Sequence, residues 1–433
     1  MDSSRHLCRV QCGTSGARDG AVTGLVLAGA AAMGAYEVGV LDYLVDEVAR
    51  DVRVVMPDVV TGTSAGAINA MALAAFAEDP AQGTRRLARA WSELRLGRML
   101  RPSSVELLSM FLDVTGAPQR LRRALQVRAI RGGLLDPAPI AQLVLQIPFD
   151  RIAEHVASGR LRGVAIPATR VASGTAVVFY QTDRLARPWM PEPNFVPIAT
   201  RITPDHVLAS AAIPLLFPTV QIDGERYCDG GLRQMVPLSP ALHLGASRLL
   251  VVNPLPAARI APVDAPSTHV NSPLYLAGKA LNALFADRVE ADLARLSHTT
   301  EILRAGERRF GPTFERELNL ELVRTGGPEL HPIDARCIEP SHDLGVLAAE
   351  YVTSPAFATR VPGAAGWLLR RIADGDPRRA GDLLAYLLFD GGFTAKLIEL
   401  GRSDARARHD DLCALFDTPS TVPERDLAHM PLR

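Results

Sequence analysis

A serine set between two glycines is the part of the sequence with the clearest chemical use. Gly62-Thr63-Ser64-Ala65-Gly66 follows the apolar run Val54–Val60 and leads into a second apolar run. This pattern predicts a strand, a sharp turn and a helix, with the serine at the apex of the turn. Gly62 and Gly66 would leave room for a crowded backbone, and the N-terminus of the helix would favour a developing oxyanion. Ser64 is therefore a candidate nucleophile, although a capping serine in a glycine-rich connection has the same pattern.

A loop of small residues upstream could serve the same chemistry. Gly29-Ala30-Ala31-Ala32-Met33-Gly34 follows Leu25–Leu27, which reads as a buried strand, and precedes an apolar helical pattern. Small side chains would let backbone N–H groups point into a cavity, as an oxyanion hole requires. Close packing of a helix on a sheet is the alternative. The segment has neither Gly-x-Gly-x-x-Gly nor Gly-Lys-Ser/Thr, which argues against a phosphate-binding loop.

Two Asp-Gly pairs lie further along the chain and have different interpretations. Asp223-Gly224 separates two short apolar runs and predicts a two-residue hairpin turn. Asp229-Gly230-Gly231 has no matching second strand after it. A carboxylate at Asp229 within reach of Ser64 could take the serine proton as a general base.

Four segments together resemble the patatin-like phospholipases, in particular their bacterial members, in sequence, order and spacing. The family consists of serine acyl hydrolases that use a Ser-Asp dyad, and the resemblance covers residues 22–255. The matching segments are Gly29–Gly34, Gly62–Gly66, Ala209–Pro218 and Asp229–Gly231.

The resemblance implies a role for each of these segments. Ser64 would be the nucleophile and Asp229 its base, and Ala209–Pro218 would lie close to the active site. The backbone amides of Gly29, Ala30, Ala31 and Ala32 would form the oxyanion hole. The implied function is that of a phospholipase A or a lysophospholipase-like esterase. It would act on a lipid or phospholipid with no cofactor and no metal, and the sequence indicates no protein partner.

One departure from the family leaves a second function open. The family usually has Gly-Gly-Gly-x-Arg/Lys-Gly where this chain has two alanines in place of glycine and Met33 in place of the basic residue. Alanine restricts the backbone, so the oxyanion hole survives only if these positions need no positive φ. The alternative is a weakened or inactive patatin fold that binds a lipid or a partner.

A conventional α/β-hydrolase is the other alternative. Three histidines follow Asp229 in the serine, acid, histidine order of a Ser-His-Asp triad: His243, His298 and His342. None of them lies in a supporting motif.

Composition limits the kinds of partner and the compartment. The 433 residues include 47 basic and 47 acidic side chains, so no net charge attracts nucleic acid. The cysteines are odd in number and have no paired spacing, which predicts a reduced, cytoplasmic compartment. No apolar run approaches the roughly twenty residues that span a bilayer, so membrane contact is expected to be peripheral. The cysteines are Cys8, Cys12, Cys228, Cys337 and Cys413.

Alternating strand and helix patterns predict an α/β fold. We expect a layered patatin-like sheet with helices on both faces, followed by a mostly helical C-terminal extension. Residues 1–20 read as a flexible N-terminal tail without a secretory signal. Residues 21–310 would form the hydrolase domain, and residues 311–433 the extension.

Overall fold

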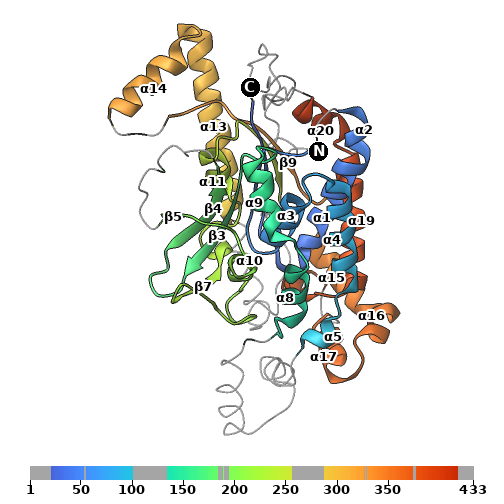
Figure 1. The fold of residues 1–433 in the computed structure, drawn as a ribbon. Coiled ribbons are helices and arrows are strands. Elements are labelled where there is room, and N and C mark those ends of the chain that lie inside the picture. The colour runs from blue at the N-terminus through green and yellow to red at the C-terminus, as the bar shows by residue number, and fades with distance from the viewer. Residues whose placement is uncertain are drawn as a thin grey trace, which may run out of the picture.

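The structure is a computed structural model, and a mixed β-sheet runs through its centre (Figure 1). It describes residues 21–52, 55–100, 133, 135–183, 189, 195–255, 287–325, 327, 329–373 and 377–417, so the predicted N-terminal tail lies outside the described residues. The strands are β1 (Thr23–Leu27), β2 (Val59–Gly62), β3 (Gly163–Arg170), β4 (Ala176–Thr182), β5 (Phe195–Ala199), β6 (Val220–Ile222), β7 (Glu225–Asp229), β8 (Arg248–Val252) and β9 (Asp334–Ile338).

The order of the strands brings the two candidate segments to one edge of the sheet. The order is β5-β4-β3-β2-β1-β8-β9, with β7 paired to β3 and β6 paired to β7. Strands β3, β2, β1, β8 and β9 run parallel, whereas β4 and β7 are antiparallel to β3. The loops after β1 and β2 therefore leave the sheet side by side at its carboxyl edge, where such sheets place their sites.

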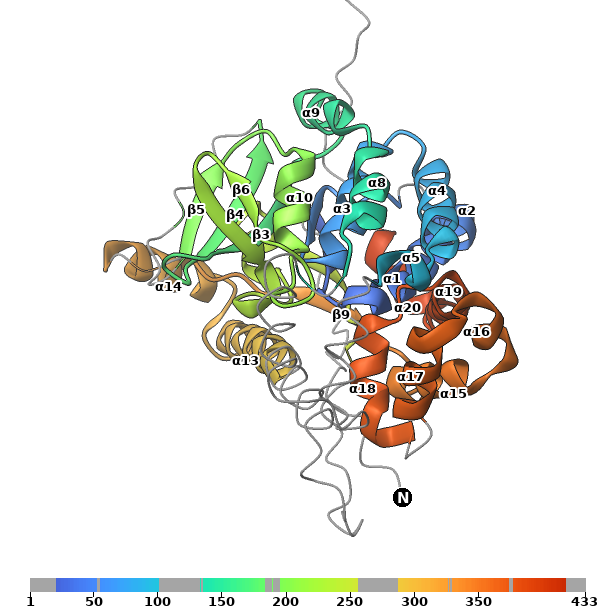
Figure 2. The same cartoon turned by 90° about the horizontal axis from the view of Figure 1, so that it is seen from below.

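Helices cover the sheet and form the C-terminal part of the chain (Figure 2). The helices of the first half are α1 (Ala35–Tyr43), α2 (Ala49–Asp51), α3 (Ala65–Ala75), α4 (Pro80–Glu93), α5 (Leu96–Met99), α8 (Ala138–Leu145), α9 (Phe149–Ala157), α10 (Pro204–Ser210) and α11 (Leu238–His243). Those of the second half are α13 (Asp287–Phe310), α14 (Phe314–Arg324), α15 (Leu344–Thr353), α16 (Pro355–Arg360), α17 (Gly363–Ala373), α18 (Pro377–Leu387), α19 (Gly391–Arg406) and α20 (His409–Phe416).

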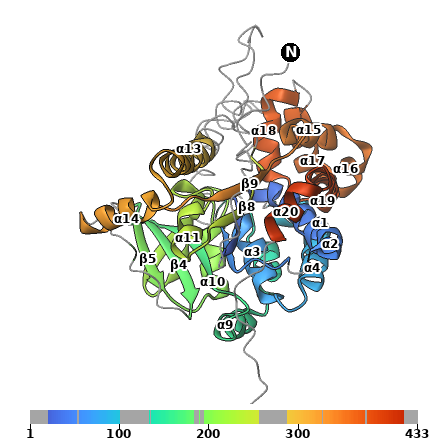
Figure 3. The same ribbon diagram turned by 90° about the horizontal axis from the view of Figure 1, so that it is seen from above.

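Both faces of the sheet carry helices, which confirms the predicted fold class. Helix α3 packs on β1, β2 and β3 from one side together with α1 and α4, and α11 packs on the same three strands (Figure 3). Helices α3 and α11 share these three strands but do not pack on each other, so they lie on opposite faces of the sheet.

The tight turn that the sequence predicts at Asp223-Gly224 is present in the structure. The Asp223-Gly224 hairpin is confirmed, since both residues have positive φ, at 50° and 84°, and they join β6 to β7.

Strand β2 begins at Val59, later than the predicted start at Val54. Pro57 has no N–H to give to a ladder, and the Asp58 carboxylate accepts the N–H of Thr23 at 2.8 Å instead.

The C-terminal part is mostly helical and packs against the sheet domain. Strand β9 pairs with β8, and α19 lies along α1. At that crossing a Cβ on Gly39 would overlap the carbonyl of Ile398, so the two backbones meet at glycine. Because strand β9 and helices α18, α19 and α20 all pack against elements before residue 311, the division at that residue stays a prediction.

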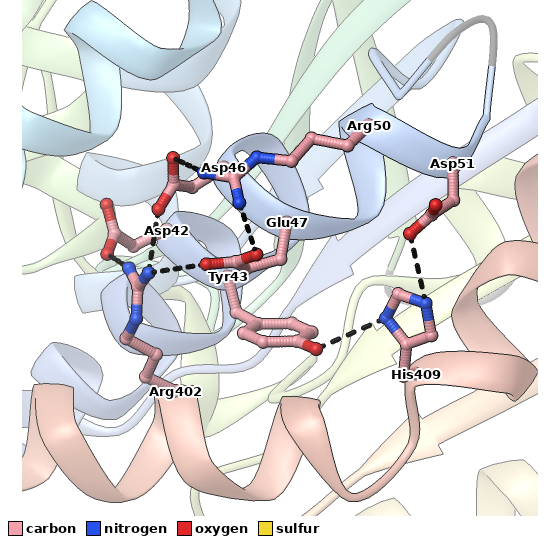
Figure 4. A network of polar contacts seen from close by, with 8 residues as sticks. All are labelled: Asp42, Tyr43, Asp46, Glu47, Arg50, Asp51, Arg402 and His409. Carbon is pink, nitrogen blue, oxygen red and sulfur yellow. Dashed lines mark hydrogen bonds and ion pairs between the residues drawn. The ribbon is translucent and has the colours of Figure 1, made fainter.

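Ion pairs reinforce this crossing. Arg402 on α19 pairs with Asp42, with Asp46 at 2.7 Å and with Glu47 at 3.5 Å (Figure 4). The Arg402 guanidinium is also the main cause that lowers the pKa of Asp46.

Within the described parts of the chain, no helix combines the length and the apolar character needed to cross a membrane.

We expect Gly39→Ala to destabilise the protein by about 1–3 kcal/mol, because the added methyl group forces α19 away from α1. Denaturant unfolding measures the change. Gly97→Ala is the matched control, since its Cβ would meet nothing nearer than the Arg360 carbonyl at 4.0 Å. Equal stability of the two variants would contradict the close backbone contact.

Candidate active site

Ser64 sits at the turn between β2 and α3 in a strained backbone conformation. Its φ and ψ are 55° and −122°, and its side chain is buried. Positive φ costs a non-glycine residue about 1–3 kcal/mol and persists where the surroundings enforce it. A Cβ on Gly62 would overlap the carbonyl of Gly66, and one on Gly66 would lie 2.5 Å from the Leu27 carbonyl oxygen. The flanking glycines therefore allow the turn, as predicted.

The backbone of Ser64 is held by a hydroxyl from a distant segment. Its N–H donates to Oγ of Ser210 at 2.9 Å, and Ser210 is fully buried at the end of α10. Ser210 belongs to the Ala209–Pro218 segment that was expected near the site. The structure thus places this segment directly against the candidate nucleophile.

Asp229 ends β7, and its carboxylate is buried beside Ser64. Oδ1 accepts the N–H of Gly231 at 2.7 Å, whereas Oδ2 has no hydrogen-bond partner among the described residues. Burial raises the pKa of Asp229 to about 7, and the Ser64 hydroxyl and the Gly231 N–H offset part of this rise. The Ser64–Asp229 contact is close enough to affect the pKa but does not meet hydrogen-bond geometry.

The backbone of Asp229 is fixed from two sides. Its N–H donates to the Ala212 carbonyl at 2.9 Å, and Thr169 Oγ1 donates to its carbonyl at 2.8 Å. The carboxylate position therefore follows from the pairing of β7 with β3.

The Gly29 loop approaches Ser64 from β1. A Cβ on Gly29 would lie 3.2 Å from the Ser64 Cβ and 2.6 Å from the Met235 Sδ. The Gly29 N–H already donates to the Met235 carbonyl at 3.0 Å, so it is not available to an oxyanion. The N–H groups of Ala30, Ala31 and Ala32 donate no hydrogen bond within the described residues.

The two departures from the family pattern have different structural consequences. Ala31 has φ of 49°, a conformation that glycine adopts without cost and that strains alanine by about 1–2 kcal/mol. Alanine therefore adopts positive φ here at a cost in strain, so the expectation that the loop can form only without positive φ at these positions is wrong. Met33 is buried, so its side chain packs in the core and carries no charge toward the site.

The segment that follows Asp229 joins the loop to the serine turn. The Met235 carbonyl accepts from Gly29, the Gln234 carbonyl accepts from Thr63 Oγ1 at 2.9 Å, and the Pro237 carbonyl accepts from Thr61 Oγ1 at 3.1 Å. One stretch of backbone therefore sets the positions of both loops relative to Asp229.

A buried polar network fixes the far end of the Gly29 loop. Asn69 on α3 donates to the Gly34 carbonyl at 2.9 Å and to Glu37 Oε2 at 2.8 Å, and Trp91 Nε1 donates to Asn69 Oδ1 at 2.9 Å. Burial raises the pKa of Glu37 well above its usual range, although the hydrogen bond from Asn69 lowers it in part. The network joins α1, which follows the Gly29 loop, to α3, which follows Ser64. The sequence signal was an acidic residue within an apolar helical pattern.

The other candidate groups lie elsewhere. His243 stacks on Trp189, His298 is exposed on α13, and His342 contacts Ser341. Within the described residues none of the three contacts Ser64 or Asp229, so the geometry does not support a Ser-His-Asp triad. Burial raises the pKa of Cys228 to about 11, which keeps it a thiol.

We expect Ser210→Ala to lower stability by about 1–3 kcal/mol, because it leaves the buried N–H of Ser64 without a partner. The hydrolysis rate should also fall, because the same contact holds the serine turn. Ser239→Ala, which removes a partly buried hydroxyl on α11, is the control for denaturant unfolding. A Ser210→Ala protein as stable as the parent would show that the contact does not hold the serine turn.

Comparison with known proteins bears on the family of this chain. The family model of the patatin-like phospholipases matches residues 25–242, half of the chain, and includes Ser64 and Asp229. No curated protein matches the sequence. Solved structures match as well, one of them VipD from Legionella pneumophila, at 13% identity over 95% of this chain and 71% of the VipD chain, with a TM-score of 0.32. On the strength of the family match, the chain belongs to the patatin-like phospholipase family.

Proposed function

We propose that this protein is a serine lipid acyl hydrolase, of phospholipase A or lysophospholipase type, in which Ser64 and Asp229 form the catalytic dyad. The observation that carries the proposal is the buried Asp229 carboxylate, which lies close enough to the Ser64 hydroxyl for that hydroxyl to lower its pKa. Membership of the family supports a lipid ester as the substrate.

In the proposed reaction Asp229 takes the proton of Ser64 while the serine Oγ attacks the ester carbonyl carbon. The amides of Ala30, Ala31 and Ala32 donate to the oxyanion of the tetrahedral intermediate. The intermediate collapses to an acyl-enzyme, and Asp229 returns the proton to the departing alcohol. Water, activated by the same carboxylate, then releases the fatty acid.

The environment of Asp229 suits a general base. Oδ2 has no hydrogen-bond partner among the described residues, so it is available to accept a proton. A base works best when its pKa lies near the working pH, and burial brings the pKa of Asp229 to about 7.

The proposal predicts that Ser64→Ala and Asp229→Asn each abolish hydrolysis, because one lacks the nucleophile and the other the base. Hydrolysis of a short-chain nitrophenyl ester and of phospholipid vesicles measures the loss. Normal turnover by either variant would exclude the dyad. An unmodified protein that hydrolyses neither substrate would instead favour the lipid- or partner-binding alternative.

Stability measurements show whether Asp229→Asn loses activity because it lacks the base or because it fails to fold. The folded-state pKa of Asp229 lies above its ordinary value of 3.8, so its ionisation destabilises the folded protein. The penalty is absent below about pH 4, grows as the pH rises to about 7 and then stays constant, reaching up to about 4 kcal/mol. Asp229→Asn should therefore be more stable than the parent at about pH 8 and equally stable at about pH 4.

The pH dependence of hydrolysis follows from the same carboxylate. Only ionised Asp229 can accept the serine proton, so kcat/KM should rise with pH and level off with an apparent pKa of about 7. A profile measured with the soluble ester from about pH 5 to about pH 9 tests this. A rate that does not vary over this range would contradict the role of Asp229 as the base.

A further inference from the structure

Three side chains with metal-binding donor atoms, from two segments far apart in sequence, lie close together. Asp51 is the last residue of α2, and His409 and Cys413 lie on α20. The donor atoms of all three lie within 4.8 Å of one another. Figure 4 shows Asp51 and His409 pointing toward each other from the two segments.

The spacing within α20 puts two of the donors on one helix face. His409 and Cys413 are four residues apart, so their side chains are neighbours on the helix surface. His409 Nε2 lies 3.4 Å from Cys413 Sγ and 3.3 Å from Asp51 Oδ2. One ring nitrogen thus has a sulfur and a carboxylate oxygen as close neighbours.

Two of the three separations fit one tetrahedral ion, and the third, between Asp51 and Cys413, is within 4.8 Å. Zinc–ligand bonds of about 2.0–2.1 Å to nitrogen and oxygen and about 2.3 Å to sulfur place nitrogen and oxygen roughly 3.3 Å apart, and nitrogen and sulfur roughly 3.6 Å apart. Both distances in the cluster lie within a few tenths of an ångström of these values. A protonated Nε2 has one N–H and could donate it to only one of its two neighbours. A cation between the three atoms would be bound by all of them.

The orientation of the histidine ring supports the same arrangement. The other ring nitrogen of His409, Nδ1, lies 3.2 Å from the Tyr43 hydroxyl, and the two rings meet edge to face. If Nδ1–H donates to the tyrosine, the lone pair of Nε2 faces Asp51 and Cys413. Histidine ligands are commonly fixed in this way by a partner on the second nitrogen.

We propose that Asp51, His409 and Cys413 bind one Zn²⁺, with water as the fourth ligand. Thiolate, imidazole and carboxylate are each ligand types that zinc binds in proteins. The ion joins α20 to the end of α2, and so stabilises the contact between two segments far apart in sequence. The His409 side chain is partly exposed and that of Asp51 is exposed, so solvent can supply the fourth ligand.

The test is the zinc content of the purified full chain after dialysis against zinc and removal of the excess. We expect about one zinc per chain for the parent, and its loss in His409→Ala and in the near-isosteric Cys413→Ser. Cys337→Ser and His342→Ala are matched controls outside the cluster and should keep the ion. A parent protein without stoichiometric zinc, or full zinc content in both cluster variants, would overturn the proposal.

Two further readouts do not depend on catalysis. Cobalt bound in place of zinc should give the near-ultraviolet absorption of a thiolate ligand, which Cys413→Ser removes and Cys337→Ser retains. A chelator should lower the melting temperature of the parent by several degrees and leave that of Cys413→Ser unchanged. Equal effects of the chelator on both proteins would contradict the site.

Discussion

The close approach of backbone segments around Ser64 is the constraint on which the rest of the site depends. The turn after β2 puts the serine at positive φ, and the carbonyls of Leu27 and Gly66 come so near that Gly62 and Gly66 cannot carry side chains. Such a turn persists only if its surroundings hold it. The Ser210 hydroxyl and the carbonyls of Gln234 and Pro237 hold it by hydrogen bonds, and the neighbouring Met235 carbonyl fixes the Gly29 loop beside the serine.

Burial of Asp229 connects stability with chemistry. A carboxylate with one unpartnered oxygen in a buried site costs folding free energy when it ionises, because it has lost its water. The same loss raises its pKa toward neutrality, where a general base is most effective. Glu37 is buried too and its Oε1 also lacks a hydrogen-bond partner among the described residues, but its Oε2 accepts from Asn69 in the network that fixes the loop, so it positions the loop without taking part in the proposed proton transfer. The site thus contains one carboxyl suited to chemistry and another suited to structure.

The sequence predicted those parts of the molecule that depend on local pattern. The serine turn, the Asp223-Gly224 hairpin and the alternation of strands and helices follow from residues close together in the chain, and the structure has them. Contacts between distant segments were not predictable in this way. Ser210 lies 146 residues from Ser64, and no local pattern shows that its hydroxyl accepts the serine N–H. The cluster of Asp51 with His409 and Cys413 was missed for the same reason, since only the spacing of the last two is visible in sequence.

The most direct test of the account is covalent labelling with a fluorophosphonate, followed by mass spectrometry of the intact chain and of its peptides. Labelling requires an activated hydroxyl and working oxyanion donors, but no knowledge of the natural lipid. The account predicts one adduct per chain, located on Ser64, that forms in the parent and is nearly absent in Asp229→Asn. An adduct on another residue, or labelling of Ser64 at the same rate without the Asp229 carboxylate, would contradict it.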